Sequence, residues 1–122
     1  MAPVLVVDGA NVVGSVPDGW WRDRAGAAVR LRDALVPVAD AGLDGVPGPV
    51  RVVLVVEGAA RGVTGVDGVE VVSAPGSGDD TIVEVAASAD GPVWVVTADR
   101  ALRERVRAVG AHVVGPRAVP RR

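Results

Sequence analysis

The chain has 122 residues, of which 49% are hydrophobic and 23% are charged, and its formal net charge is −2. This composition excludes a disordered chain, and the length is that of one domain with a core of its own. The absence of cysteine excludes disulfides, thiolate nucleophiles and cysteine-based zinc sites, and the negative net charge disfavours nucleic acid as a partner unless local arginines or a bound metal offset it.

The first predicted element is a strand over residues 3–7, a run of apolar and mostly β-branched side chains. Such a run is typical of a strand that is buried on both faces. It is too short for a signal peptide or a membrane span, so a cytoplasmic location without membrane contact is expected. The strand ends at Asp8, and a loop is predicted over residues 8–14.

A helix is predicted next, over about residues 20–38, with Asp18 as its cap. Apolar residues recur along it at helical spacing and give it one buried face. These residues are Ala27, Leu31, Ala34, Leu35 and Val38. The glycine- and proline-rich stretch over residues 41–49 indicates a turn region.

Two further strands are predicted over residues 50–56 and 69–73, and the first of them ends at Glu57. The connection between them, residues 58–68, shows no helical pattern. It is also short, because a crossover between parallel strands usually needs a dozen or more residues.

The remaining elements alternate between helix and strand. A helix begins near Asp79 or Asp80, after the chain-breaking residues 74–78. A strand over residues 93–97, a helix over about 99–109 and a short strand over 112–114 follow. Residues 116–122 show no periodicity and are expected to form a frayed tail.

This order of elements predicts an α/β fold, a three-layer α/β/α sandwich with a mostly parallel sheet of about five strands. A single domain is expected over residues 1–115. We find no internal repeat and no second domain.

Acidic residues follow the predicted strands at the points where the strands end. Asp8 ends the first, Glu57 the second, and Asp99 the fourth, while Asp79 and Asp80 open the helix after the third. In a parallel sheet these positions share the carboxyl edge, where ligands bind. Crowded carboxylates repel one another and need a cation unless they are protonated or paired with arginine. Hard oxygen ligands suit Mg²⁺ or Mn²⁺, which can activate a bound water for attack on a phosphate.

Each acid also has a simpler interpretation. Asp79, Asp80 and Asp99 lie where helix N-caps lie, and aspartate is a preferred cap. Glu57 could be an ordinary solvated residue at a strand end. Caps explain these residues one by one, but they do not explain why so many strand ends deliver an acid to one edge.

Three segments resemble motifs of a known nuclease family. The segment Val6-Val7-Asp8-Gly9-Ala10-Asn11 resembles the first motif of NYN domains, a branch of the PIN-like nucleases. The segments Asp80-Thr81-Ile82-Val83-Glu84 and Val96-Thr97-Ala98-Asp99 resemble a helix start and a strand end of the YacP-like NYN proteins. The three segments occur in the family's order and span nearly the whole chain.

The resemblance implies a PIN-like fold with strand order 3-2-1-4-5, metal-dependent ribonuclease chemistry, and catalytic carboxylates at Asp8, Asp80 and Asp99. Asn11 would orient Asp8 or a metal-bound water. The metal ligands would be the same three aspartates with Glu57. The family usually has aspartate where this chain has Glu57, and a small residue where it has Asp79, so Asp79 is an extra acid without an assigned role.

Arginines and tryptophans near these motifs are candidates for contact with a substrate. Arg22, Arg24 and Arg100 are predicted to hold substrate phosphates, although each could instead pair with a nearby aspartate. Trp20 and Trp21 point about 100° apart on a helix. One is expected to pack on the sheet, and the other could stack on a base, although core packing of both is the simpler interpretation.

The function that the sequence predicts is a metal-dependent ribonuclease, with Mg²⁺ or Mn²⁺ as cofactor and single-stranded or structured RNA as partner. Two alternatives stay open: a nucleotide phosphohydrolase that uses the same metal site, and a non-catalytic RNA-binding or interaction module. The sequence allows a homo-oligomer.

Overall fold

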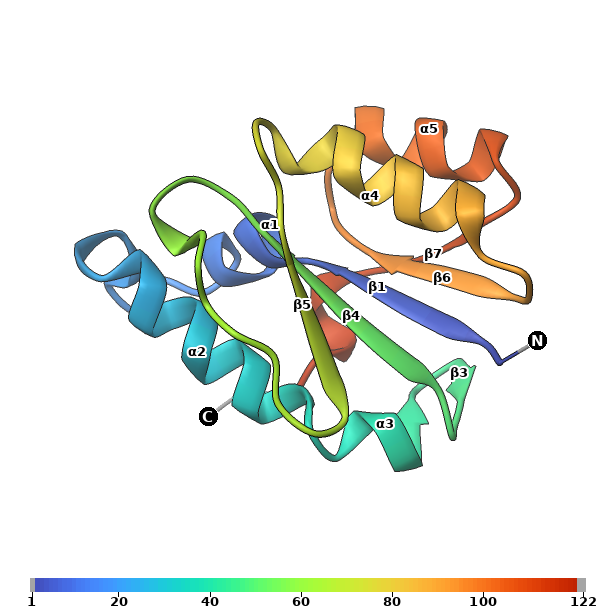
Figure 1. The fold of residues 1–122 in the computed structure, drawn as a ribbon, viewed down its shortest axis with the longest axis horizontal. Coiled ribbons are helices and arrows are strands. Elements are labelled where there is room, and N and C mark those ends of the chain that lie inside the picture. The colour runs from blue at the N-terminus through green and yellow to red at the C-terminus, as the bar shows by residue number, and fades with distance from the viewer. Residues whose placement is uncertain (1, 121–122) are drawn as a thin grey trace.

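The computed structural model describes residues 2–120, and its centre is a sheet of five parallel strands (Figure 1). In chain order these are β1 (Val4–Asp8), β4 (Arg51–Val56), β5 (Val69–Ser73), β6 (Val93–Val96) and β7 (His112–Val114). Their order across the sheet is β5-β4-β1-β6-β7. The predicted α/β fold with a mostly parallel sheet is confirmed. The chain builds outward from β1 on one side and then on the other, so the topological switch point lies between β1 and β6.

Two layers of helices cover the two faces of the sheet. The helices are α1 (Gly9–Gly14), α2 (Arg24–Leu35), α3 (Val38–Ala41), α4 (Gly78–Ser88) and α5 (Arg100–Ala108). Because successive strand side chains point to opposite faces, Leu5 and Val7 pack with α1, α2 and α3, whereas Val4 and Val6 pack with α4 and α5. Within residues 2–120, no helix combines the length and apolar character that crossing a membrane requires.

The segment between β1 and β4 differs from the prediction in three places. Residues 9–14 form α1 instead of a loop, because Asp8 acts as its N-cap; one turn and a half is too short to show a periodic pattern. The helix predicted over 20–38 is divided into a 3₁₀ turn, η1 (Trp20–Arg22), followed by α2 and α3. Asp23, not Asp18, caps α2, since its carboxylate accepts a 2.9 Å hydrogen bond from the Gly26 N–H. Pro37 lacks the N–H that would continue α2.

The predicted turn region over residues 41–49 contains a small hairpin of β2 (Gly42–Leu43) and β3 (Val46–Pro47). Gly42 adopts a φ of 73°, which favours glycine. Val46 is only 1% exposed and joins the core beneath α2 and α3. The hairpin therefore closes the end of the sheet where β4 begins.

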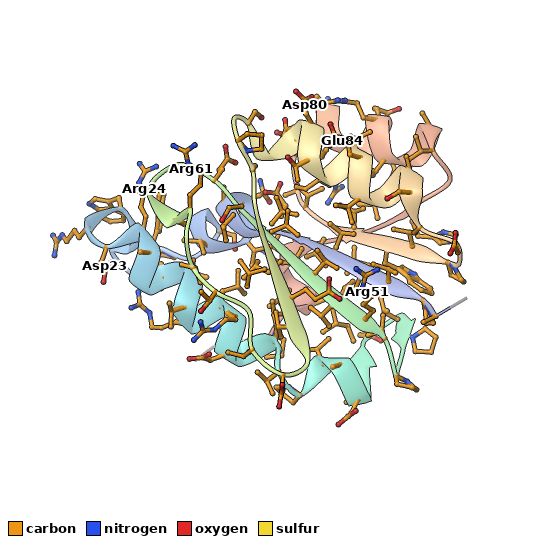
Figure 2. All side chains as sticks on the ribbon, viewed as in Figure 1. Asp23, Arg24, Arg51, Arg61, Asp80 and Glu84 are labelled. Carbon is orange, nitrogen blue, oxygen red and sulfur yellow. The ribbon has the colours of Figure 1, made fainter. Side chains whose placement is uncertain are left out.

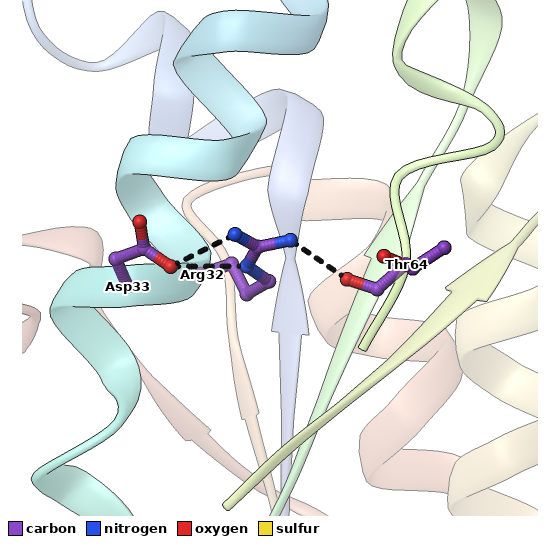
Figure 3. A network of polar contacts seen from close by, with 3 residues as sticks. All are labelled: Arg32, Asp33 and Thr64. Carbon is purple, nitrogen blue, oxygen red and sulfur yellow. Dashed lines mark hydrogen bonds and ion pairs between the residues drawn. The ribbon is translucent and has the colours of Figure 1, made fainter. Parts of the chain in front are cut away.

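The connection from β4 to β5 crosses the α2 face without an α-helix. It contains only a 3₁₀ turn, η2 (Gly58–Ala60), and Ala60 and Val63 pack against the core. Arg32 of α2 fastens it, because its Nη1 donates a 2.9 Å hydrogen bond to the Thr64 carbonyl while Asp33 holds the same guanidinium at 3.0 Å (Figure 3). A parallel crossover this short is thus held by a side chain of the neighbouring helix.

Residues 116–119 are packed, although a frayed tail over 116–122 is expected from the sequence. A 3₁₀ turn, η3 (Pro116–Ala118), follows β7, and Val119 is only 2% exposed within the same core as Leu5. Burial of Pro116 and Val119 explains the difference, because two apolar contacts suffice to hold a segment without periodicity. Arg121 and Arg122, the end of the predicted tail, lie outside the described residues.

Candidate active site

Asp8 ends the central strand at the switch point and is only 5% exposed. One carboxylate oxygen accepts a 3.3 Å hydrogen bond from the Asn11 N–H, and the other accepts a 2.8 Å bond from the Thr97 hydroxyl. The chain turns into α1 at once, so close to β4 that a Cβ on Gly9 would lie 2.5 Å from the Val55 carbonyl oxygen. Only glycine fits there, and the turn that presents Asp8 depends on it.

Thr97 connects the acids of β1 and of the loop after β6. It is fully buried, and its hydroxyl both donates to Asp8 and accepts a 3.1 Å hydrogen bond from the Asp99 N–H. Its carbonyl accepts a 3.0 Å bond from Arg103 Nε. No role for Thr97 is predicted from the sequence. The sequence signal that could have identified Thr97 is a hydroxyl residue directly after a buried strand and two positions before Asp99.

Asn11 fixes the same loop from the other side. Its side-chain oxygen accepts a 2.8 Å hydrogen bond from the Ala98 N–H, while its own N–H donates to Asp8. Asp99 is the N-cap of α5, since it accepts a 3.0 Å bond from the Leu102 N–H. The structure therefore gives Asn11 a positioning role, with its carboxamide oxygen bound to backbone.

On α4, Asp79 is the acid whose charge interacts with those of Asp8, Glu57 and Asp99. Burial raises the pKa of Asp79, and the negative charges of Asp99 and Glu57 raise it further against the opposing charge of Arg105. Asp80 is exposed and forms a 2.8 Å ion pair with Arg105 of α5. The helix begins at Gly78 with Ser77 as its N-cap, and because each helical residue turns by about 100°, this start turns Asp80 outward.

The structure thus does not bring Asp80 into the acid group that the resemblance implies. Figure 2 shows Asp80 and Glu84 together on α4, and both side chains are exposed. The aspartate without an assigned role, Asp79, lies among the other acids instead.

Glu57 lies against the first residue of α4. A Cβ on Gly78 would be 3.0 Å from a Glu57 carboxylate oxygen, so the small residue there leaves room for the acid. The charge of Glu57 raises the pKa of both Asp8 and Asp79. The Glu57 carboxylate therefore lies close enough to Asp8 and Asp79 for its charge to act on both.

The environment of Asp8 opposes its negative charge. Burial raises the pKa of Asp8; the hydrogen bonds from Thr97 and Asn11 lower it, and the charges of Asp79 and Glu57 raise it.

We call the four acids at this edge the acid cluster: Asp8, Glu57, Asp79 and Asp99. No three acidic or histidine side chains within residues 2–120 converge closely enough to hold a metal ion as they stand. Carboxylates without thiolates are the donor set that Mg²⁺ and Mn²⁺ prefer.

The single histidine, His112, is remote from the acid cluster. It is the first residue of β7, so it lies at the amino end of a parallel strand. Its ring lies 5.7 Å from that of Trp94. An exposed histidine in this position cannot assist the acids.

The structure separates the three arginines that are predicted to bind substrate. Arg24 lies over the Trp20 ring at 5.2 Å, and Arg22 lies over the Trp21 ring at 5.9 Å. Arg100 opens α5 directly after Asp99 and is exposed. Trp20 is half-buried and Trp21 is 54% exposed, so the expected packing of a tryptophan on the sheet is wrong: neither ring enters a core.

A pocket of about 320 Å³ lies beside the acid cluster, between α1, α2 and η2. Glycine and alanine line much of it, and Trp20, Arg24 and Glu57 supply the large side chains. Because Gly9 and Glu57 contribute to its wall, the pocket is continuous with the edge where Asp8 ends β1. It is the size of a small ligand site.

No model of a protein family matches the chain, and no curated protein matches it in sequence. Two solved structures of Rae1 (YacP) from Bacillus subtilis are similar to it. One, a tryptophan-to-leucine mutant, has a TM-score of 0.75 and 21% identity over 97% of this chain and 72% of the Rae1 chain. The other has a TM-score of 0.72 and 20% identity over 94% and 70%, respectively. The chain therefore has a YacP-like fold.

Proposed function

We propose that this protein is a metal-dependent ribonuclease of the NYN branch of the PIN-like nucleases. The observation that carries the proposal is the acid cluster, with its buried member at the switch point of the sheet. No arginine within residues 2–120 forms an ion pair with Asp8, Glu57, Asp79 or Asp99. Arg105 acts on Asp79 only at a distance, since its ion pair is with Asp80. Carboxylates that repel one another without a direct ion pair are typical of residues arranged for a cation.

The acid cluster would hold Mg²⁺ or Mn²⁺. Such an ion supplies a nucleophilic water and neutralises charge on a phosphate. The chain's own contribution is to position the carboxylates. Thr97 and Asn11 keep the Asp8 carboxylate oriented and favour its ionised form, and the cap of α5 fixes Asp99.

Substrate phosphates would contact arginines at the rim of the site. Arg24 lines the pocket beside Glu57, and Arg100 follows Asp99 on the exposed first turn of α5. Local cations are needed, because a net charge of −2 repels a polyanion. RNA as the substrate rests on the resemblance of the three sequence segments to NYN motifs.

The test is a cleavage assay on single-stranded and structured RNA with added Mn²⁺. Asp8→Asn and Asp99→Asn are expected to abolish cleavage, because each removes a negative ligand. Glu70→Gln is the matched control, since Glu70 is an acid of the same sheet that is paired with Arg51. If RNA cleavage persisted in both Asp8→Asn and Asp99→Asn, the proposed mechanism would be wrong.

A nucleotide phosphohydrolase with the same acid cluster is the second candidate, and the pocket beside Glu57 favours it because its volume suits a single nucleotide. Nucleoside triphosphates offered under the same conditions separate the two activities. Release of phosphate from them, without RNA cleavage, would assign the site to nucleotides.

A non-catalytic RNA-binding or interaction module is the third candidate. The capping role of Asp99 favours it, because capping alone accounts for that acid. Titration calorimetry with Mn²⁺ discriminates: an ion that neither binds nor stabilises the fold would support this candidate against both enzymes.

A further inference from the structure

The pocket beside Glu57 has walls suited to a flat aromatic group. Small residues leave its floor open: Gly9, Ala10, Ala28, Gly58 and Ala60. Trp20 forms one side, half-buried and held edge-to-face against Trp21 at 5.9 Å between centroids. A tryptophan that lines a cavity outside both cores has a ring available for stacking, and every nucleobase has a face that stacks on such a ring.

The charges around the pocket fit a nucleotide that enters with its base inward. Arg24 also lines the pocket and lies over the Trp20 ring. A base that stacks on this ring would displace the flexible Arg24 side chain toward the rim, where its guanidinium can reach the adjoining phosphate. Arg61 directly follows the lining residue Ala60, is exposed, and donates to the carbonyls of Gly58 and Pro75. In Figure 2, Arg24 lies on α2 and Arg61 lies directly after η2. The elements α2 and η2 pack together.

The volume and position of the pocket favour an unpaired base within a strand. A volume of about 320 Å³ suits one nucleoside better than a base pair with its backbone. A duplex keeps its bases stacked, whereas single-stranded RNA can place a base in a protein pocket. Glu57 belongs both to the pocket and to the acid cluster, so a base held here would put its own backbone at the carboxyl edge of the sheet.

We infer that this pocket binds one unpaired nucleobase of single-stranded RNA, stacked on Trp20, beside the phosphate that lies at the acid cluster. The inference rests on the proposed function for the identity of the strand. Trp20 is then a residue that determines specificity for unpaired RNA, and Arg24 holds the adjoining phosphate.

The experiment measures binding of a short fluorescent oligoadenylate by anisotropy, at low salt and in EDTA so that no cleavage occurs. Trp20→Leu is expected to weaken binding roughly tenfold, whereas Trp20→Phe keeps a stacking ring and is expected to bind within a few-fold of wild type. Trp94→Leu is the matched control, because Trp94 of β6 lies beside His112 and outside the pocket lining.

A second pair of variants tests the pocket without altering a tryptophan. Ala60→Leu places a larger side chain in the pocket and is expected to weaken oligoadenylate binding about as much as Trp20→Leu. Ala59→Leu adds the same volume to an exposed neighbour that does not line the pocket, and it is expected to have no effect. Circular dichroism of each variant checks that the fold is retained.

The outcomes separate this inference from the proposed function. Wild-type binding by folded Trp20→Leu and Ala60→Leu, or an equal loss in folded Trp94→Leu, would overturn the pocket while leaving metal-dependent cleavage intact. Adenosine monophosphate that competes as tightly as the oligoadenylate would overturn the assignment to a strand. Retained oligoadenylate binding by Asp8→Asn, with cleavage lost, supports both proposals, and cleavage that persists in Asp8→Asn counts against the nuclease mechanism alone.

Discussion

Glu70 and Asp8 are carried by strands of one sheet, yet their surroundings are opposite. Glu70 of β5 meets Arg51 of β4 in a two-pronged pair of 2.7 and 2.8 Å, and the Arg51 hydrogen bonds lower the pKa of Glu70. Asp8 is buried at the carboxyl edge with Asp79 and Glu57 nearby, and burial raises its pKa. Glu70, which serves the fold, is paired on the surface, whereas the acids of the cluster form no direct ion pair with an arginine within residues 2–120. Figure 2 shows Arg51 near the start of β4, away from α4.

The largest expected effect separates two adjacent aspartates of α4. If the acid cluster holds the metal, Asp79→Asn should lower the rate of Mn²⁺-dependent RNA cleavage by roughly 100-fold or more, since even changes beside metal ligands cost about 10- to 100-fold. Asp80→Asn should change it only a few-fold, because that carboxylate is paired with Arg105. Single-turnover rates of the two variants measure the difference, and a loss of only a few-fold in Asp79→Asn would remove Asp79 from the site.

An intermediate effect is expected from Thr97→Val, which preserves shape and removes the hydroxyl. The buried Asp8 carboxylate then lacks one donor and the Asp99 N–H lacks its acceptor, so the free energy of unfolding should fall by about 1–3 kcal/mol. Urea denaturation measures it. Thr81→Val on α4 is the control, because within residues 2–120 its hydroxyl makes no hydrogen bond. A Thr97→Val protein as stable as wild type would show that the link between the two acids is dispensable.

The smallest expected effects are on the pH dependence of stability, and they have opposite signs for Asp8 and Glu70. A raised pKa means that the folded state binds more protons, so the contribution of Asp8 to stability is lost as pH rises through that pKa. The lowered pKa of Glu70 contributes stability that is lost as pH falls through it. In metal-free buffer, Asp8→Asn should therefore gain stability relative to wild type from mildly acidic to neutral pH.

Glu70→Gln should instead lose about 0.2–1 kcal/mol at neutral pH, the usual magnitude for an exposed pair, and match wild type in acid. Urea denaturation across this pH range tests both variants. The Asn side chain at position 8 can still accept from Asn11 and donate to Thr97, so packing is conserved. If the stability of Asp8→Asn and that of Glu70→Gln, each relative to wild type, changed with pH in the same direction, the contrast between Asp8 and Glu70 would be contradicted.

Strand ends could be predicted from the sequence because hydrophobic runs mark them. The valine-rich runs before Asp8 and Glu57 locate both acids correctly, since a buried strand must end where a charge begins. The choice between Asp79 and Asp80 could not be made in this way. It depends on the phase of a helix that begins at Gly78 under the Ser77 cap, and a shift of one residue turns a side chain by about 100°.

Contacts between segments that are distant in the sequence could not be predicted either. Thr97 gains its role only when β6 lies beside β1, and α1 is stabilised by a cap that a periodic pattern cannot reveal. The packed residues 116–119 show the same limit, because burial of Val119 depends on a core assembled from the first strand and the second helix.

The hydrogen bond between Thr97 and Asp8 joins residues 89 positions apart, and that between Asn11 and Ala98 spans 87. Contacts of such separation are slow to form, because a long loop must close before they return any free energy. During synthesis the N-terminal two-thirds of the chain already carries Asp8, Glu57 and Asp79. It lacks the strand β6 and the loop that order them, so a chain truncated before β6 would carry these acids without their geometry.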